Sequence, residues 1–238
     1  MISKAPRVPW TEAFPDVVTH VSIKERNEQP DYTVGKSGGR EAASRLITQL
    51  SSITAVDRLK HILGKRTPLI LPVYAVEISG TNVIPDVFAH DLARLLDLTV
   101  STAVVQMNIV GHTRADGFTR LARPAQFIGP VDAGCEYLLV DDHVGMGGTL
   151  ANLRGHIETN GGSVALMTTL TQSRNSHHIA LTDKTLHRLR EKHGGELERY
   201  WLDTFGYGLD ALTEPEAGYL FRTPDVERIR ARIAAAQR

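Results

Sequence analysis

Residues 138–149 read Leu-Leu-Val-Asp-Asp-His-Val-Gly-Met-Gly-Gly-Thr, and the organisation of the chain follows from them. An apolar run ends in two adjacent carboxylates, and a glycine-rich turn comes next. We predict a buried strand over residues 137–140 and a helix over residues 149–159 that stops at Gly161-Gly162. The helix carries its apolar side chains on one face, at Leu150, Leu153 and Ile157.

The strand, the acidic pair, the turn and the helix start together predict an anion site. Backbone N–H groups of the turn and the positive end of the helix point at the same spot. Two carboxylates beside such a site suit a ligand with a phosphate and vicinal hydroxyls, or a bridging Mg²⁺. A plain strand-to-helix turn is the alternative, but it leaves the adjacent carboxylates unexplained.

This stretch resembles the phosphoribosyl-pyrophosphate (PRPP) motif of type I phosphoribosyltransferases. In that family the acidic pair holds the ribose hydroxyls, and the loop amides hold the 5-phosphate. The resemblance therefore implies that Asp141 and Asp142 contact the ribose and Mg²⁺. The implied PRPP-binding residues are Asp141, Asp142, His143, Val144, Gly145, Met146, Gly147, Gly148 and Thr149.

Strand and helix patterns surround this motif. Strands are predicted over residues 17–23, 31–34, 69–75, 99–107 and 163–171, and helices over residues 41–50, 55–63 and 86–96. Pro72 indicates a sheet edge or an irregularity. The chain becomes helical after residue 180, with a cap at Thr182, a break at Gly194-Gly195 and a capping box that starts at Thr213.

These patterns and the resemblance predict an α/β fold with a doubly wound, mainly parallel sheet and helices on both faces. A variable hood and a helical C-terminal extension are expected to accompany it. We assign residues 1–35 to an N-terminal arm or hood, residues 36–178 to the α/β core and residues 179–238 to the extension. The hood could come from the arm, from the extension or from both.

The resemblance also identifies a pyrophosphate loop one strand–helix unit upstream. Its candidates are Glu77, Ile78, Ser79, Gly80, Thr81 and Asn82. The family often has a basic residue in this loop, and this chain has none there. Glu77 would repel a pyrophosphate unless it meets Mg²⁺ or a basic partner.

The long connection over residues 108–134 corresponds to a mobile flap in the family. Connections of this length are usually functional or disordered. The basic candidates are His112, Arg114, Arg120 and Arg123, and the resemblance implies catalytic roles for Arg114, Arg120 and Asp142. Residues 114–118 also resemble a hairpin turn. A solvated loop with incidental arginines is the alternative.

Four smaller features remain, and two of them have two interpretations. The loop over residues 36–40 either binds an anion or only starts a helix. Residues 172–174 are expected to line the cleft, because ligands of open α/β sheets sit at the carboxyl edge. His177 and His178 are not expected to bind a metal, because adjacent histidines in a strand or loop point in different directions and no further ligand spacing accompanies them. Four aromatic residues either stack on a base or pack in a core, namely Trp201, Phe205, Tyr207 and Tyr219.

Composition limits the classes of partner. The net charge is zero, so no overall field favours nucleic acid or an anionic membrane. No apolar run approaches the roughly 20 residues of a membrane span. The single cysteine, Cys135, excludes an internal disulfide framework and fits a reducing compartment. We therefore expect a cytoplasmic location.

The resemblance implies a Mg²⁺-dependent phosphoribosyltransferase. Its expected partners are PRPP and a small-molecule nitrogen acceptor, and a homodimer is a further expectation. Two departures matter: Gly145 stands where many purine enzymes carry an acidic residue, and Met146 replaces the common threonine of the phosphate loop. These departures keep open a non-catalytic PRPP or nucleotide sensor on the same fold. A third hypothesis is a different nucleotide enzyme with a doubly wound sheet.

Overall fold

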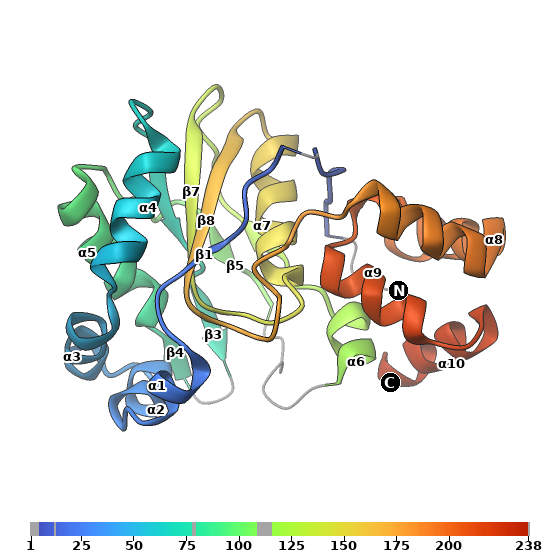
Figure 1. Cartoon of the computed structure of the whole chain (residues 1–238), viewed down its shortest axis with the longest axis horizontal. Helices are drawn as coiled ribbons and strands as arrows, with labels where there is room; N and C mark the ends of the chain where they lie inside the picture. The colour runs from blue at the N-terminus through green and yellow to red at the C-terminus, as the bar shows by residue number, and fades with distance from the viewer. Residues whose placement is uncertain (1–4, 12, 78–79, 109–115, 238) are drawn as a thin grey trace.

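In the computed structural model, a four-stranded parallel sheet lies at the centre, and helices cover both of its faces (Figure 1). The structure describes residues 5–11, 13–77, 80–108 and 116–237. The strand order is β1-β8-β7-β2, formed by Val18–Thr19, Ser163–Gln172, Glu136–Val144 and Leu69–Pro72. The predicted α/β class with a parallel sheet is confirmed.

Strand β7 is buried on both faces, and its alternate side chains enter two different cores. Leu138 and Val140 pack in a core with helices α3 (Arg40–Leu50), α4 (Ile53–Leu63) and α5 (Ile84–Leu96). Tyr137 and Leu139 pack in a second core with α7 (Gly148–Thr159). Alternation between faces follows from the pleat of a strand. Helices on both faces make the sheet doubly wound, as predicted.

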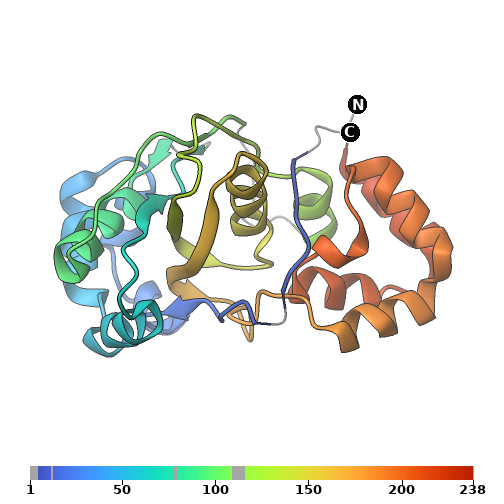
Figure 2. The same ribbon diagram turned by 90° about the horizontal axis from the view of Figure 1, so that it is seen from above.

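The C-terminal part of the chain forms a third core beside the sheet (Figure 2). Helices α8 (Asp183–Phe205), α9 (Glu214–Arg222) and α10 (Val226–Ala236) enclose it together with α6 (Gly117–Ala122) and a short 3-10 helix, Leu209–Ala211. The predicted cap at Thr182 and the capping box at Thr213 are both present. Gly194 interrupts α8 with a φ of 62°, as the Gly-Gly break predicts.

The N-terminal arm runs between the sheet and the C-terminal helices (Figure 2). It crosses α7 at Gly155, where a Cβ atom would lie only 2.1 Å from the carbonyl oxygen of Pro6. The indole of Trp10 lies under the guanidinium of Arg154 at 4.3 Å and meets the edge of Phe14 at 5.1 Å. The arm is therefore a packed part of the fold.

Two predicted strands near the N-terminus are wrong or shortened. Residues 31–34 belong to helix α2 (Asp31–Lys36), because this segment packs against α3 and α5. The strand predicted over residues 17–23 is only β1, because Ser22 and Glu25 form a capping box that starts helix α1 (Ile23–Asn27).

The segment between α5 and β7 also differs from the predictions. Residues 99–107 give only a bridge between Val100 and Ile70 and the short strand β5 (Val105–Gln106), which pairs antiparallel with β6 (Phe127–Ile128). The hairpin turn predicted around Gly117 is wrong, because Asp116 caps helix α6 there. Pro72 ends β2, the last strand in the sheet order, but Val100 bridges to Ile70 on the outer side of this strand, so β2 is not a fully open edge.

Residues 75–82 form a separate antiparallel hairpin rather than a continuation of β2. Strand β3 (Ala75–Glu77) pairs with β4 (Gly80–Asn82). Within the described ranges, no helix is both long and apolar enough to cross a membrane.

Candidate functional site

A pocket of about 390 Å³ lies where β7 ends and α7 begins. Its wall combines the carboxyl end of the sheet with α2, α6, the N-terminal arm and the C-terminal helices. The polar side chains that line it are those of Arg7, Arg26, Tyr32, Lys36, Asn82, Gln106, Arg120, Asp141, Asp142, His143, Thr149, Asn152, Tyr207 and Glu216. Segments far apart in the sequence therefore build one site.

Asp142 is held by three polar side chains of this pocket. It accepts hydrogen bonds from the hydroxyl of Tyr32 and from Nδ2 of Asn82, the latter at 3.2 Å, and Nζ of Lys36 lies 3.4 Å away. Burial alone would raise its pKa, but Lys36 and the Tyr32 hydroxyl together hold the pKa below its ordinary value. Asp142 is therefore an anion inside the pocket.

Asp141 lies beside it, and its pKa is shifted in the opposite direction. Its Oδ1 accepts a hydrogen bond from the backbone N–H of Asp142 at 2.8 Å. Burial raises the pKa of Asp141 well above its ordinary value, and the neighbouring charge of Asp142 adds to the shift. Both carboxylates belong to β7, which is longer than the strand predicted over residues 137–140.

His143 is fixed by hydroxyl groups of β8 and the connection that follows it. Hydrogen bonds join its Nδ1 to Oγ1 of Thr171 at 2.9 Å and its Nε2 to Oγ of Ser173 at 3.2 Å. Burial lowers the pKa of His143 to about 4, so the ring is neutral at neutral pH. His143 and Val144 both line the pocket.

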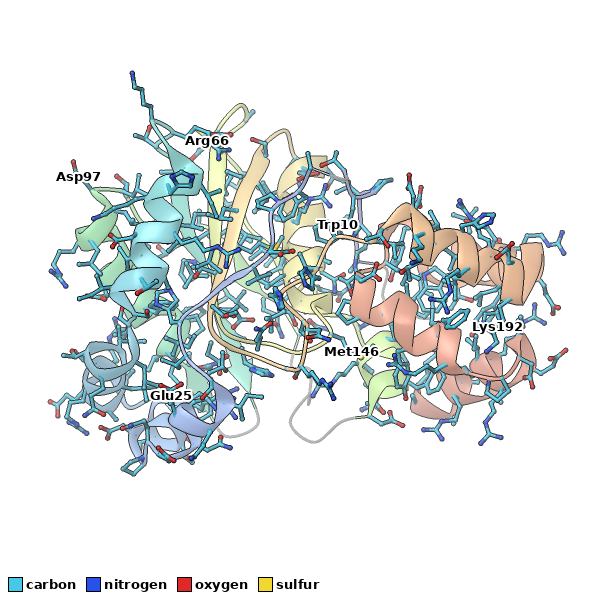
Figure 3. The ribbon with its side chains drawn as sticks, in the orientation of Figure 1. Trp10, Glu25, Arg66, Asp97, Met146 and Lys192 are labelled. Atoms are coloured by element: carbon cyan, nitrogen blue, oxygen red, sulfur yellow. The ribbon has the colours of Figure 1, made fainter. Side chains whose placement is uncertain are left out.

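The turn from β7 into α7 lines the pocket through Gly145, Met146, Gly147, Gly148 and Thr149. Gly147 has a φ of 81° and caps α7, and this left-handed conformation favours glycine. The hydroxyl of Thr213 donates to the carbonyl oxygen of Met146 at 2.6 Å. Figure 3 shows Met146 at the boundary between the sheet and the C-terminal helices. The extension therefore holds the turn.

An ion pair between the arm and the extension closes the far side of the turn. Arg7 and Glu216 are both buried, and Nη1 of Arg7 lies 2.8 Å from Oε2 of Glu216. Nη1 of Arg7 also donates to the carbonyl oxygen of Ala211 at 3.2 Å. A Cβ atom on Gly148 would lie 2.7 Å from Oε1 of Glu216, so a side chain at this position would displace the carboxylate.

Arg120 occupies the space beside Gly145. A Cβ atom on Gly145 would lie 2.8 Å from Nη1 of Arg120. Burial lowers the pKa of the guanidinium from its ordinary value, although the group stays charged. A basic head group thus lies beside the first residue of the glycine-rich turn.

The other predicted loop and flap residues have mixed placements. All three residues of β4 are candidates. Asn82 lines the pocket, whereas Gly80 and Thr81 are absent from the described lining. The backbone of Glu77 ends β3, and Ile78, Ser79, His112 and Arg114 lie outside what the structure describes. Arg123 donates to the carbonyl oxygen of Ala236 at 2.9 Å and is exposed, so its side chain is directed to α10.

Residues 172–174 do not reach the described pocket wall directly, contrary to expectation. Gln172 binds His177, Arg174 is exposed, and Ser173 acts only through its hydrogen bond to His143.

The aromatic candidates separate into core and site residues. Trp201 and Phe205 are buried in the C-terminal core, which is the packing alternative for these two residues. Tyr219 meets the edge of Phe118 at 5.0 Å. Tyr207 lines the pocket, and Arg7 lies 5.2 Å from its ring centre.

Sequence reasoning missed five lining residues that matter for charge and shape. The sequence predicts an anion contact for Lys36 only as part of a loop, and it predicts no binding role for Arg7, Arg26, Tyr32 and Glu216. Its place in a basic, glycine-rich loop before a helix is the local signal for Lys36. Nothing local in the sequence pairs Arg7 with Glu216.

The expectation that His177 and His178 diverge is wrong. Their ring centres are 3.8 Å apart, and the planes are inclined by 40°. The reason is that His177 lies in a turn rather than a strand, so neighbouring side chains do not alternate. Asp16 lies beside them, with Oδ1 at 2.9 Å from Nδ1 of His178.

Comparison with known proteins finds relatives whose names give no activity. No family model matches the chain. Over 235 residues, it is 43% identical to Protein TraN of Escherichia coli. The matched region covers 99% of this chain and 52% of that protein. Over 151 residues, it is 34% identical to an uncharacterized protein of Haemophilus influenzae. This matched region covers 63% of this chain and 34% of that protein. The chain thus spans about half the length of the first relative and about a third of the second.

Similar solved structures include phosphoribosyltransferases. Adenine phosphoribosyltransferase from Thermoanaerobacter pseudethanolicus is 20% identical, with a TM-score of 0.34, over 51% of this chain and 75% of that one. Hypoxanthine phosphoribosyltransferase from Trypanosoma cruzi is 15% identical, with a TM-score of 0.32, over 73% and 75% of the two chains. TM-scores this low do not establish a common fold or activity.

Proposed function

We propose that the pocket binds PRPP and Mg²⁺ and that the chain transfers the 5-phosphoribosyl group to a nucleobase-like nitrogen acceptor, releasing pyrophosphate. One observation carries the proposal: the buried pair Asp141 and Asp142 shares a pocket with the glycine-rich turn at the N-terminus of α7. That juxtaposition offers acceptors for ribose hydroxyls and N–H donors for a phosphate.

The donor set also fits Mg²⁺, which prefers carboxylate oxygens. The raised pKa of Asp141 reflects two buried carboxyl groups held side by side, an arrangement that a divalent cation stabilises. In the proposal, Asp141 and Asp142 hold this ion, which supplies positive charge to the pyrophosphate group.

The basic side chains of the pocket stabilise the negative charge that develops in the proposed reaction. The bond from ribose C1 to the pyrophosphate oxygen breaks, and a bond from C1 to the acceptor nitrogen forms. Negative charge grows on the departing pyrophosphate, and Arg26, Lys36 and Arg120 line the pocket in which it grows. Arg114 keeps its proposed role in the flap. The reaction needs no protein nucleophile.

A PRPP or nucleotide sensor is the second candidate, and the contacts of Asp142 favour it. Tyr32, Lys36 and Asn82 already satisfy this carboxylate, so a ribose must replace or share these contacts. Gly145 also offers no side chain to move a proton on an acceptor. Binding would then shift α2, which carries Tyr32 and Lys36, without turnover.

Two measurements test the proposal. In titration calorimetry with Mg²⁺ present, Asp142→Asn is expected to weaken PRPP binding at least about tenfold, because truncating one side of a buried charged network costs more than 1.4 kcal/mol. Asp57→Asn, an exposed change on α4, serves as the matched control and should leave binding unchanged.

Pyrophosphate release across a panel of nucleobases then separates the two candidates. Release with any base supports the transferase, whereas PRPP binding without release across the panel supports the sensor. Failure of the wild-type chain to bind PRPP would exclude both. The single cysteine fits a reducing compartment, so the proposal places the activity in the cytoplasm.

A further inference from the structure

A second cluster of polar side chains lies on the connection after β8, outside the pocket wall. Asp16, His177 and His178 each offer one ligand atom, and these atoms lie within 4.8 Å of one another. Asp16 comes from the N-terminal arm, whereas the two histidines come from the connection between β8 and α8. The cluster therefore bridges two segments that are distant in the sequence.

A main-chain hydrogen bond also joins the two segments that carry the cluster. The backbone N–H of Val17, the neighbour of Asp16, donates to the carbonyl oxygen of His177 at 2.9 Å. This bond fixes the two segments next to each other. The carboxylate and the imidazoles are thus placed by the backbone as well as by their own attraction.

Gln172 sets the tautomer of His177. Its Oε1 accepts the backbone N–H of His177 at 2.8 Å and lies 2.6 Å from the ring Nδ1. A backbone N–H only donates, so the amide atom at this position is the oxygen, and Nδ1 carries the ring proton. The lone pair is therefore on Nε2. Metal-binding histidines characteristically donate their second ring N–H to an oxygen in this way.

The donor set selects a class of metal ion. Imidazole nitrogens favour Zn²⁺ and neighbouring transition ions, whereas Mg²⁺ and Ca²⁺ favour oxygen. Zinc bond lengths of about 2.0–2.2 Å put tetrahedral ligand atoms roughly 3.3–3.5 Å apart, so small side-chain rotations would complete the set. The charge of Arg58 also reaches His177 and opposes a cation, and Asp16 offsets it.

We propose that Asp16, His177 and His178 form a Zn²⁺ site that fastens the N-terminal arm to the connection after β8. Water fills the fourth position. The same connection carries Ser173, which binds His143 in the pocket. The ion therefore stabilises the arm and the support of the pocket together. This site is independent of PRPP and of the acidic pair.

Titration calorimetry of the metal-free full chain with Zn²⁺ tests the proposal. We expect one site, and His178→Ala and Asp16→Asn should each weaken it at least about tenfold, as loss of a ligand or its support does. Both side chains are partly or fully exposed, so these variants should fold. His187→Ala is the matched control, because His187 is an exposed histidine on α8.

Three results of the calorimetry would contradict the Zn²⁺ site. No binding of Zn²⁺, an unchanged affinity in His178→Ala, or an equal loss in His187→Ala would overturn the site. Hydrogen exchange of residues 13–17 provides a second measurement. Zn²⁺ should slow exchange there in the wild-type chain and not in His178→Ala, and unchanged wild-type exchange would overturn the fastening role.

Discussion

Single residues explain how far the candidate site could be predicted. The acidic pair and the turn through Thr149 were predictable, because adjacent carboxylates between an apolar run and a Gly-rich turn form a local pattern. The partners of Asp142 were not predictable in the same way. Tyr32 reaches it from 110 residues away, and only the packing of α2 brings the hydroxyl there.

His20 gives a prediction of how the stability of the protein depends on pH. Its Nδ1 accepts the backbone N–H of Ser52 at 3.0 Å, and its Nε2 is buried without a partner among the described residues. Burial lowers the pKa of His20 to about 4, whereas the unfolded value is about 6.5. The unfolded state therefore binds the proton first, and stability falls as the pH drops from about 6.5 to about 4.

The full loss attributable to His20 is about 3 kcal/mol. Urea denaturation of the wild-type chain and of His20→Gln between about pH 7 and pH 4 measures it. The variant should be less stable at neutral pH and less sensitive to acid. His143 contributes with the same sign in both chains, so its effect cancels in the difference. Parallel pH curves would contradict the prediction.

At the scale of elements, periodic and well-capped segments were predictable and short ones were not. Helices α4, α5 and α7 follow apolar periodicity, and β8 contains the apolar run over residues 164–167 inside a continuously buried strand. Helix α2 was mistaken for a strand because Tyr32, Thr33 and Val34 are strand formers. Tertiary contact overrides that preference: Gly35 lies close under Ile84 of α5, where a Cβ atom would be only 2.9 Å from Cγ1.

The crossing of the arm over α7 gives a prediction for Gly155→Ala. Alanine normally stabilises a helix relative to glycine by about 1 kcal/mol. Here its methyl group would meet the carbonyl of Pro6, so the arm must move. We expect a loss of about 2 kcal/mol in the free energy of unfolding and faster proteolysis within the arm.

Gly195→Ala on α8 is the control for this change, because no atom lies within 4 Å of the position that its methyl group would take. It should be neutral or slightly stabilising. Equal stability changes in the two variants would show that the arm does not depend on Gly155.

At the scale of the whole molecule, three cores meet around the pocket. Two lie on the faces of the sheet, and the third belongs to the C-terminal helices. The pocket uses side chains from the sheet edge, the arm and the third core. Sequence patterns predicted the helical extension, but its contact with the turn at Met146 depends on long-range packing.

The ion pair between Arg7 and Glu216 gives the prediction for this scale. Burial alone would lower the pKa of Arg7, but Glu216 raises it, so the pair is charged. Arg7→Met or Glu216→Gln should each cost about 3 kcal/mol of unfolding free energy, because either change leaves a buried group without its partner.

The double variant Arg7→Met/Glu216→Gln should cost less than the sum of the two single changes, by at least about 1 kcal/mol. Urea denaturation of the four chains gives this coupling energy. Strict additivity would mean that the arm and the extension do not stabilise each other through this pair.

The contact between Arg7 and Glu216 can form only late in the synthesis of the chain. The two residues are 209 positions apart, and ribosomes add roughly 5–20 residues per second. A newly made arm therefore waits roughly 10–40 s for its partner. The strands and carboxylates of the sheet emerge during this interval, so the nascent chain carries the acidic pair of the pocket before the wall that contains Glu216 is made.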